Sequence, residues 1–230
     1  MRPAALIFDV DGTLAETAEA HRDAFNTTFR AWNLGWHWDR DDFRQLLKTA
    51  GGRERLRAFQ ATLPLSARRL DDDEIARLHA AKTARYEATL AEGGLAPRPG
   101  VTALIDRARA EGMRLAVATT TSRPNVDALC RCCWGRAAED LFEAIAAGDA
   151  VAAKKPAPDV YRLALEMLAL APADVLAFED SRIGLASARG AGLEVIVAPS
   201  ACTQGEDFSG ADLLVDSLDD PRVVERVFGA

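Results

Sequence analysis

The chain has 230 residues, enough for one large domain or for one domain with a smaller one inserted into it. Hydrophobic residues make up 49% of the chain, but no apolar run is long enough to cross a bilayer, so we expect no membrane span. The net charge of −7 argues against a nucleic-acid binder, although an anionic small substrate stays possible because local charge governs a cleft.

The N-terminal residues lack the basic region, apolar stretch and cleavage site of a secretory signal. Of the four cysteines, three crowd together at Cys130, Cys132 and Cys133, without the paired spacing of a zinc site. We interpret these three as small helix residues in a reducing compartment and expect a cytoplasmic protein.

The first predicted element is a buried strand at residues 4–8, which leads into Asp9 and Asp11. Alternate residues of a strand point to the same side, so the two carboxylates should lie together. Gly12 then allows a sharp turn. Open α/β sheets bind ligands at the carboxyl ends of their strands, and paired acids there need a cation to balance their repulsion. We therefore expect Mg²⁺ at this strand end.

Residues 16–91 show helical patterns throughout: one helix to about residue 32, one from 39, one after Gly51 and Gly52, and one from 71 to about 90. Strands flank this segment, so we predict an all-helical insertion at 16–91 in a core made of residues 1–15 and 92–230. The glycine pair before basic Arg53 forms either an anion cradle or a plain helix start.

Residues 93–100, rich in glycine and proline, are predicted to return the chain to the core. Strands near 114–118, 144–147, 175–178, 194–198 and 213–215 then alternate with helices. The fold class is therefore α/β, with a Rossmann-like parallel sheet.

Polar groups follow three of these strands, at Thr119, at Lys155 and at Glu179 with Asp180. Taken singly, they could be a strand-end hydroxyl, a solvated lysine and helix-capping acids. Taken together, they supply what phosphoryl transfer needs: a hydroxyl with a neighbouring N–H group, a fixed cation, and acids for a metal ion.

The run Asp9-Val10-Asp11-Gly12-Thr13, followed in order by Thr119, Lys155 and Glu179-Asp180, resembles the motifs of the haloacid dehalogenase (HAD) phosphotransferases. The resemblance implies that the core carries an inserted helical cap. It implies that Asp9 is the nucleophile that becomes an aspartyl phosphate and that Asp11 is the general acid and base. It also implies Mg²⁺ held by Asp9, the Asp11 carbonyl, Glu179 and Asp180.

Within this family the chain is similar to the CbbY group of sugar-phosphate phosphatases, which act on xylulose 1,5-bisphosphate. Supporting runs are Asp9 to Thr17, Thr49 to Arg55, Ala118 to Ser122 and Ala153 to Pro156. Arg53 replaces the lysine usual in that group, which keeps the charge but changes the geometry. The resemblance implies substrate contacts from Glu16, His21, Gly51, Gly52, Arg53, Lys82, Thr119, Thr120 and Lys155.

Alternatives within the family are a β-phosphoglucomutase and a phosphoglycolate phosphatase. Thr13 is typical of the phosphatases, whereas β-phosphoglucomutases tend to have an aliphatic residue at that position. An inactive scaffold used for binding would show a lost catalytic residue, and none is lost here. We expect a monomer that binds a small anionic sugar phosphate, with neither nucleic acid nor membrane as a partner.

Overall fold

A single parallel sheet forms the centre of the computed structural model, which describes residues 2–229. Its strands lie in the order β3-β2-β1-β4-β5-β6, so the direction of winding reverses between β1 and β4. The strands are β1 (Ala5–Phe8), β2 (Arg114–Ala118), β3 (Ala144–Ala146), β4 (Val175–Glu179), β5 (Glu194–Val197) and β6 (Leu213–Leu214). This confirms the predicted α/β class and Rossmann-like sheet, with strand ends within a residue or two of those expected.

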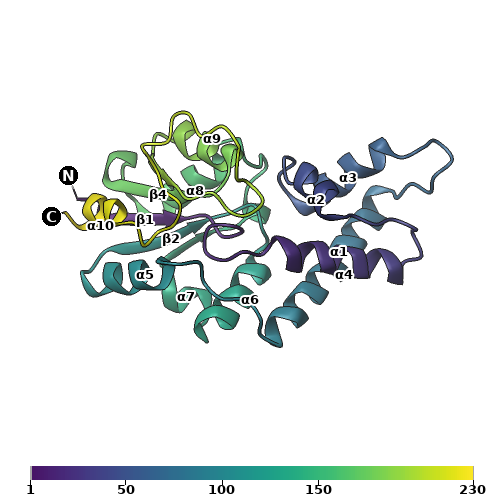
Figure 1. Cartoon of the computed structure of the whole chain (residues 1–230), viewed down its shortest axis with the longest axis horizontal. Coiled ribbons are helices and arrows are strands. Elements are labelled where there is room, and N and C mark those ends of the chain that lie inside the picture. Colours follow the sequence, from purple (N-terminus) through teal and green to yellow (C-terminus); the bar gives the residue numbers. More distant parts are fainter. Residues whose placement is uncertain (1, 230) are drawn as a thin grey trace.

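Helices cover both faces of the sheet (Figure 1). The helices around the sheet are α5 (Val101–Ala110), α6 (Arg123–Trp134), α7 (Ala138–Leu141), α8 (Asp159–Leu168), α9 (Arg182–Gly190) and α10 (Pro221–Phe228). Alternate residues of β1 enter different cores: Leu6 and Phe8 pack with α5, α6 and α10, whereas Ala5 and Ile7 pack with α8 and α9. Two 3₁₀ turns, η1 (Gly148–Ala150) and η2 (Pro172–Asp174), complete this part.

The sequence analysis did not anticipate α7 or α10. The first is a single turn, too short for a periodic pattern. The second begins with Pro221 after Asp220, whose side chain accepts a hydrogen bond from the Arg222 N–H group. Proline in the first turn after a capping aspartate is a recognisable start signal, so α10 could have been found.

Four further helices form a separate bundle beyond the carboxyl ends of the strands (Figure 1). They are α1 (Ala18–Ala31), α2 (Arg40–Leu46), α3 (Gly52–Thr62) and α4 (Asp72–Ala91), here called the helical bundle. The bundle has an apolar core of its own, in which Trp38 contacts the rings of Phe25 and Phe29. Asp39 and Asp71 cap α2 and α4, each through a reciprocal pair of hydrogen bonds with the residue three positions later.

All four cysteines are free thiols, and Cys130, Cys132 and Cys133 lie on α6 as predicted. Burial raises the pKa of Cys130 to about 12, so this thiol is unreactive at neutral pH. Among residues 2–229, no helix combines the length and the apolar character that a membrane crossing requires.

Candidate active site

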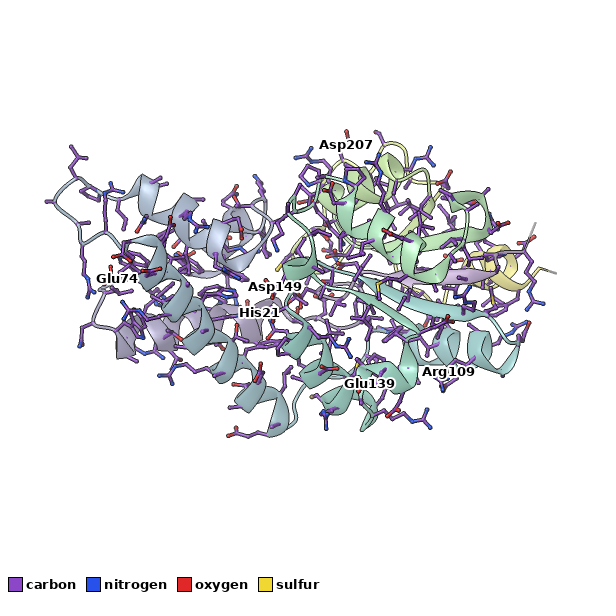
Figure 2. The ribbon with its side chains drawn as sticks, turned by 180° about the vertical axis from the view of Figure 1, so that it is seen from behind. His21, Glu74, Arg109, Glu139, Asp149 and Asp207 are labelled. Carbon is purple, nitrogen blue, oxygen red and sulfur yellow. The ribbon has the colours of Figure 1, made fainter. Side chains whose placement is uncertain are left out.

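A cavity of about 680 Å³ lies between the carboxyl edge of the sheet and the helical bundle. Its sheet side contains Asp9, Thr119 and Asp180, which follow β1, β2 and β4. Figure 2 labels one residue from each side of this cavity, His21 of the bundle and Asp149 of η1. The strand exits predicted to share a site therefore do converge, at the point where the order of the sheet reverses.

Lys155 joins two buried carboxylates at the bottom of the cavity. Its ammonium nitrogen lies 2.7 Å from Asp9 Oδ1 and 2.6 Å from Glu179 Oε1. The hydroxyl of Tyr161 donates to the same Glu179 oxygen at 2.7 Å. Burial lowers the pKa of Lys155, but the charges of Asp9 and Glu179 outweigh this and raise it above its usual range. Lys155 therefore stays protonated beside Asp9 at neutral pH.

Burial also raises the pKa values of the neighbouring acids Asp9 and Asp180. It raises the pKa of Asp9 to about 7, against the opposing charge of Lys155. The pKa of Asp180 is raised well above its usual range, first by burial and then by the charges of Asp9 and Glu179. The site therefore holds more negative charge than Lys155 alone can balance.

That excess charge fits a divalent cation. Asp9, Glu179 and Asp180 each offer a carboxylate oxygen, and the three atoms lie within 4.8 Å of one another. Carboxylate oxygens are the ligands that Mg²⁺ prefers. Gly12 and Gly184 lie where a side chain would collide with the carboxylates of Asp180 and Glu179, so both positions leave room for this cluster.

Asp11 faces the helical bundle instead. Its Oδ1 accepts a hydrogen bond from the Thr17 hydroxyl at 2.7 Å and lies 3.0 Å from Nε2 of His21. The other ring nitrogen of His21 is 2.6 Å from the ammonium of Lys82, and its ring stacks on Tyr86 at 3.9 Å. Because an ammonium only donates, Nδ1 accepts from Lys82 and Nε2 carries the hydrogen given to Asp11.

This chain of contacts sets the pKa of each member. Burial raises the pKa of Asp11, but His21, Thr17 and Lys82 outweigh it and hold the value well below the usual range. Burial and the charge of Lys82 lower the pKa of His21 to about 4, so its ring is neutral near neutral pH. Burial lowers the pKa of Lys82 to about 7, close to physiological pH. Asp11 thus connects to a group that exchanges a proton near pH 7.

The start of α3 forms the far wall of the cavity. Gly51 has a φ of 90°, which suits glycine, and a side chain at Gly52 would overlap the ring of His79. Arg53 pairs with Asp149 of η1 at 3.3 Å, across the gap between bundle and sheet. Thr120 also lines the cavity.

Thr119 and Glu16 also line the cavity. The Thr119 hydroxyl accepts a hydrogen bond from the backbone N–H of Thr121 at 3.2 Å. Glu16 accepts from the backbone N–H of Ala201 at 3.2 Å and lies 3.4 Å from Arg98. Every residue predicted for the site, apart from Glu179, which is buried beside it, therefore lines this cavity.

Three residues that support the site were missed by the sequence analysis. Arg98 donates to the backbone carbonyls of Gly12, Ala198 and Pro199, which fixes the turn after β1 against the loop after β5. Tyr161 orients Glu179, and the Thr203 hydroxyl donates to the Asp180 carbonyl at 2.6 Å. Each partner lies far away in the sequence, so no local pattern marks these residues.

Comparisons with known proteins agree with this geometry. The model of a family described as haloacid dehalogenase-like hydrolase matches residues 3–192. Protein CbbY of Rhodobacter capsulatus is 57% identical over 214 residues, 93% of each chain. The crystal structure of CbbY from Rhodobacter sphaeroides with phosphate has 53% identity and a TM-score of 0.91, over 95% of this chain and 96% of that one.

Two other solved structures are informative. A variant of the Rhodobacter sphaeroides protein was crystallised with xylulose-(1,5)bisphosphate and matches with a TM-score of 0.91 and 52% identity, over 95% and 96% of the two chains. A β-phosphoglucomutase from Clostridium difficile has a TM-score of 0.79 at 21% identity, over 99% and 97% of the chains, which shows a shared fold alone.

Proposed function

This chain belongs to the haloacid dehalogenase-like hydrolases and is a phosphatase of phosphoric monoesters, and on that basis we propose that it converts xylulose 1,5-bisphosphate to xylulose 5-phosphate. The observation that carries the proposal is the two-sided cavity, with Asp9 and Lys155 on one side and basic residues on the other. A substrate with phosphates at both ends matches that charge distribution. The complex of the Rhodobacter sphaeroides relative with this bisphosphate supports the choice.

Asp9 is the proposed nucleophile. Its carboxylate oxygen attacks the phosphorus, and the bond from phosphorus to the sugar oxygen breaks. Lys155, held 2.7 Å from Asp9, stays protonated and balances charge on the phosphoryl oxygens. Thr119 adds a hydroxyl at the end of β2 for another phosphoryl oxygen. Asp9, Glu179, Asp180 and the Asp11 carbonyl would hold Mg²⁺, which would supply further positive charge against the transferred phosphoryl group.

Asp11 is the proposed general acid and base. It gives its proton to the leaving sugar oxygen and then takes one from the water that attacks the phosphorus of the aspartyl phosphate. This second step releases phosphate and restores Asp9. Because Asp11 is ionised in the free enzyme, the proton for the first step has to reach it, and the hydrogen-bonded path from Lys82 through His21 can supply it, since Lys82 titrates near neutral pH.

The helical bundle is proposed to act as a cap, with residues 16–91 as one domain and residues 1–15 and 92–230 as the core. In support, the bundle has its own apolar core and contributes His21, Arg53 and Lys82 to the cavity. A closed cap would exclude bulk water and leave the positioned water to attack the aspartyl phosphate. We also propose a cytoplasmic monomer, which gel filtration and cell fractionation would check.

A substrate screen tests the function. Purified enzyme with Mg²⁺ would be given xylulose 1,5-bisphosphate, ribulose 1,5-bisphosphate, β-glucose 1-phosphate and phosphoglycolate, with phosphate release and product identity measured for each. We expect the highest kcat/KM on xylulose 1,5-bisphosphate, and loss of activity in EDTA that Mg²⁺ restores. Preferred hydrolysis of phosphoglycolate, an isomerised glucose phosphate, or binding without turnover would each refute the proposal.

A further inference from the structure

Five basic side chains of the helical bundle line the side of the cavity opposite Asp9. They are His21, Arg53, Arg55, His79 and Lys82. Proton-bearing groups of this kind recognise a phosphate by donating hydrogen bonds to its oxygens. Which of them is free to do so depends on the bonds that each already makes.

Four of the five already have partners. His21 is bonded at both ring nitrogens, to Asp11 and to Lys82. Arg55 donates to two backbone carbonyls, those of Leu46 and Thr49, at 3.1 and 3.4 Å. Arg53 pairs with Asp149. His79 differs, since within residues 2–229 neither of its ring nitrogens has a hydrogen-bond partner.

The position of His79 suits a ligand contact. It lies on α4 one turn before Lys82, and its ring rests against Gly52, the residue before Arg53. A side chain at Gly52 would overlap this ring, so the glycine lets the ring stay at the cavity wall. The ring is half-buried and lines the cavity, and its two nitrogens make no hydrogen bond to any other residue within 2–229.

We propose that His79 is a specificity-determining residue that donates a hydrogen bond to the phosphate of a sugar bisphosphate that is not transferred. This inference rests on the proposed function, because it assumes that the far end of the substrate carries a second phosphate. It assigns that phosphate to the space between His79 and the start of α3.

The strength of this hydrogen bond depends on whether the His79 ring is protonated. Burial and the neighbouring cations lower the pKa of His79 to about 3, so the free enzyme holds a neutral ring. The groups facing it are Lys82 of its own helix, Arg53 and Arg55 of α3, and His21 of α1. Glu54, also at the start of α3, has its carboxylate against Gly51. A bound dianion would offset most of this surrounding positive charge, so we expect substrate binding to raise the pKa of His79 and to favour addition of a proton to the ring.

Steady-state kinetics provide the first test. In His79→Asn we expect KM for xylulose 1,5-bisphosphate to rise about 10- to 100-fold, with kcat changed by less than about threefold. KM for xylulose 1-phosphate, which lacks the second phosphate, should stay nearly constant. His37→Asn is the matched control, because His37 is exposed and outside the cavity. Equal rises in KM for both substrates would overturn the proposal.

Calorimetry provides a readout that a purely structural role would not change. Inactive Asp9→Asn protein with Mg²⁺ would be titrated with xylulose 1,5-bisphosphate near pH 7 in buffers of different ionisation enthalpy. We expect net proton uptake, to which Lys82 also contributes because its pKa is about 7, and we expect the uptake to fall when His79→Asn is added, with a smaller effect for xylulose 1-phosphate. Unchanged uptake in the double variant would overturn the proposal.

Two further outcomes are distinguishable. If the parent enzyme hydrolyses xylulose 1,5-bisphosphate and His79→Asn leaves its selectivity intact, the proposed function stands and the role of His79 fails. If the parent prefers substrates with a single phosphate, both fail. His79→Gln, with its unfolding midpoint compared with that of the parent, checks that the loss does not come from a collapsed cavity wall, and it should show the same selectivity change.

Discussion

Within residues 2–229, Lys155 is the one cation paired with the buried carboxylates of the metal-site cluster, and Lys155→Met removes its charge while keeping a side chain of similar length. The Lys155 side chain is 4% exposed and balances Asp9 at 2.7 Å and Glu179 at 2.6 Å. Removing one partner of a buried ion pair typically costs about 3–5 kcal/mol, because the remaining charge is left uncompensated. We therefore expect the free energy of unfolding of metal-free protein to fall by about 3–5 kcal/mol. We also expect kcat to fall by roughly 10²-fold or more, since the phosphoryl oxygens lose a fixed cation.

Urea unfolding in EDTA measures the change in the free energy of unfolding. EDTA is needed because a bound metal ion would compensate the unbalanced negative charge. Lys154→Met is the matched control: this neighbouring lysine donates to the Gly148 carbonyl and faces no carboxylate in the cluster, so we expect a loss below about 1.5 kcal/mol. Adding Glu179→Gln to Lys155→Met should recover part of the lost stability without recovering activity, because it neutralises one of the stranded acids.

A stabilising role for the Lys155 charge would be refuted by a Lys155→Met loss below about 1 kcal/mol, the range of an exposed pair. It would also be refuted if Glu179→Gln lowered the stability of Lys155→Met further. In that case packing around Tyr161, and not charge, would decide the stability of this part of the molecule.

Three further predictions concern other residues of the site. Asp9→Asn should lower kcat by roughly 10⁴-fold or more with an unchanged circular dichroism spectrum, because an amide is a poor nucleophile, and turnover near the parent rate would exclude Asp9 from that role. Arg53→Ala should raise KM about tenfold for xylulose 1,5-bisphosphate but little for xylulose 1-phosphate. Its control is Arg57→Ala on the same helix, where Arg57 pairs with Asp72, and equal effects of Arg53→Ala on both substrates would argue against a contact with the second phosphate. Burial lowers the pKa of Lys82 from 10.5 to about 7, so the unfolded chain binds more protons between these values and stability should rise with pH there. Between about pH 7 and 10, the free energy of unfolding of the parent, measured with urea, should rise by a few kcal/mol more than that of Lys82→Met. If the free energies of unfolding of the two proteins changed in parallel with pH, this pKa would be contradicted.

Apart from α7 and α10, the sequence alone determined the order of elements, and it determined the edge of the sheet where the candidate site lies. Apolar runs such as residues 4–8 mark buried strands, and parallel strands bring their carboxyl ends to one edge. The positions of Asp9, Thr119 and Asp180 follow from that rule, so their convergence could be predicted without coordinates. The start of α4 could also be predicted, because Asp71 and the acidic residues of the first turn form a recognisable helix start.

Only the tertiary structure decided which carboxylates Lys155 pairs with and which side chains the helical bundle contributes to the cavity. Lys155 bridges Asp9 and Glu179 although 146 and 24 positions separate it from them, and His21 meets Lys82 across 61 positions. Such contacts depend on how α4 packs against α1 and how both approach the sheet, and these arrangements have no local pattern. The lack of a hydrogen-bond partner for the His79 ring could not be predicted from the sequence for the same reason. Whether a ring nitrogen has a partner depends on how side chains that are far apart in the chain pack together.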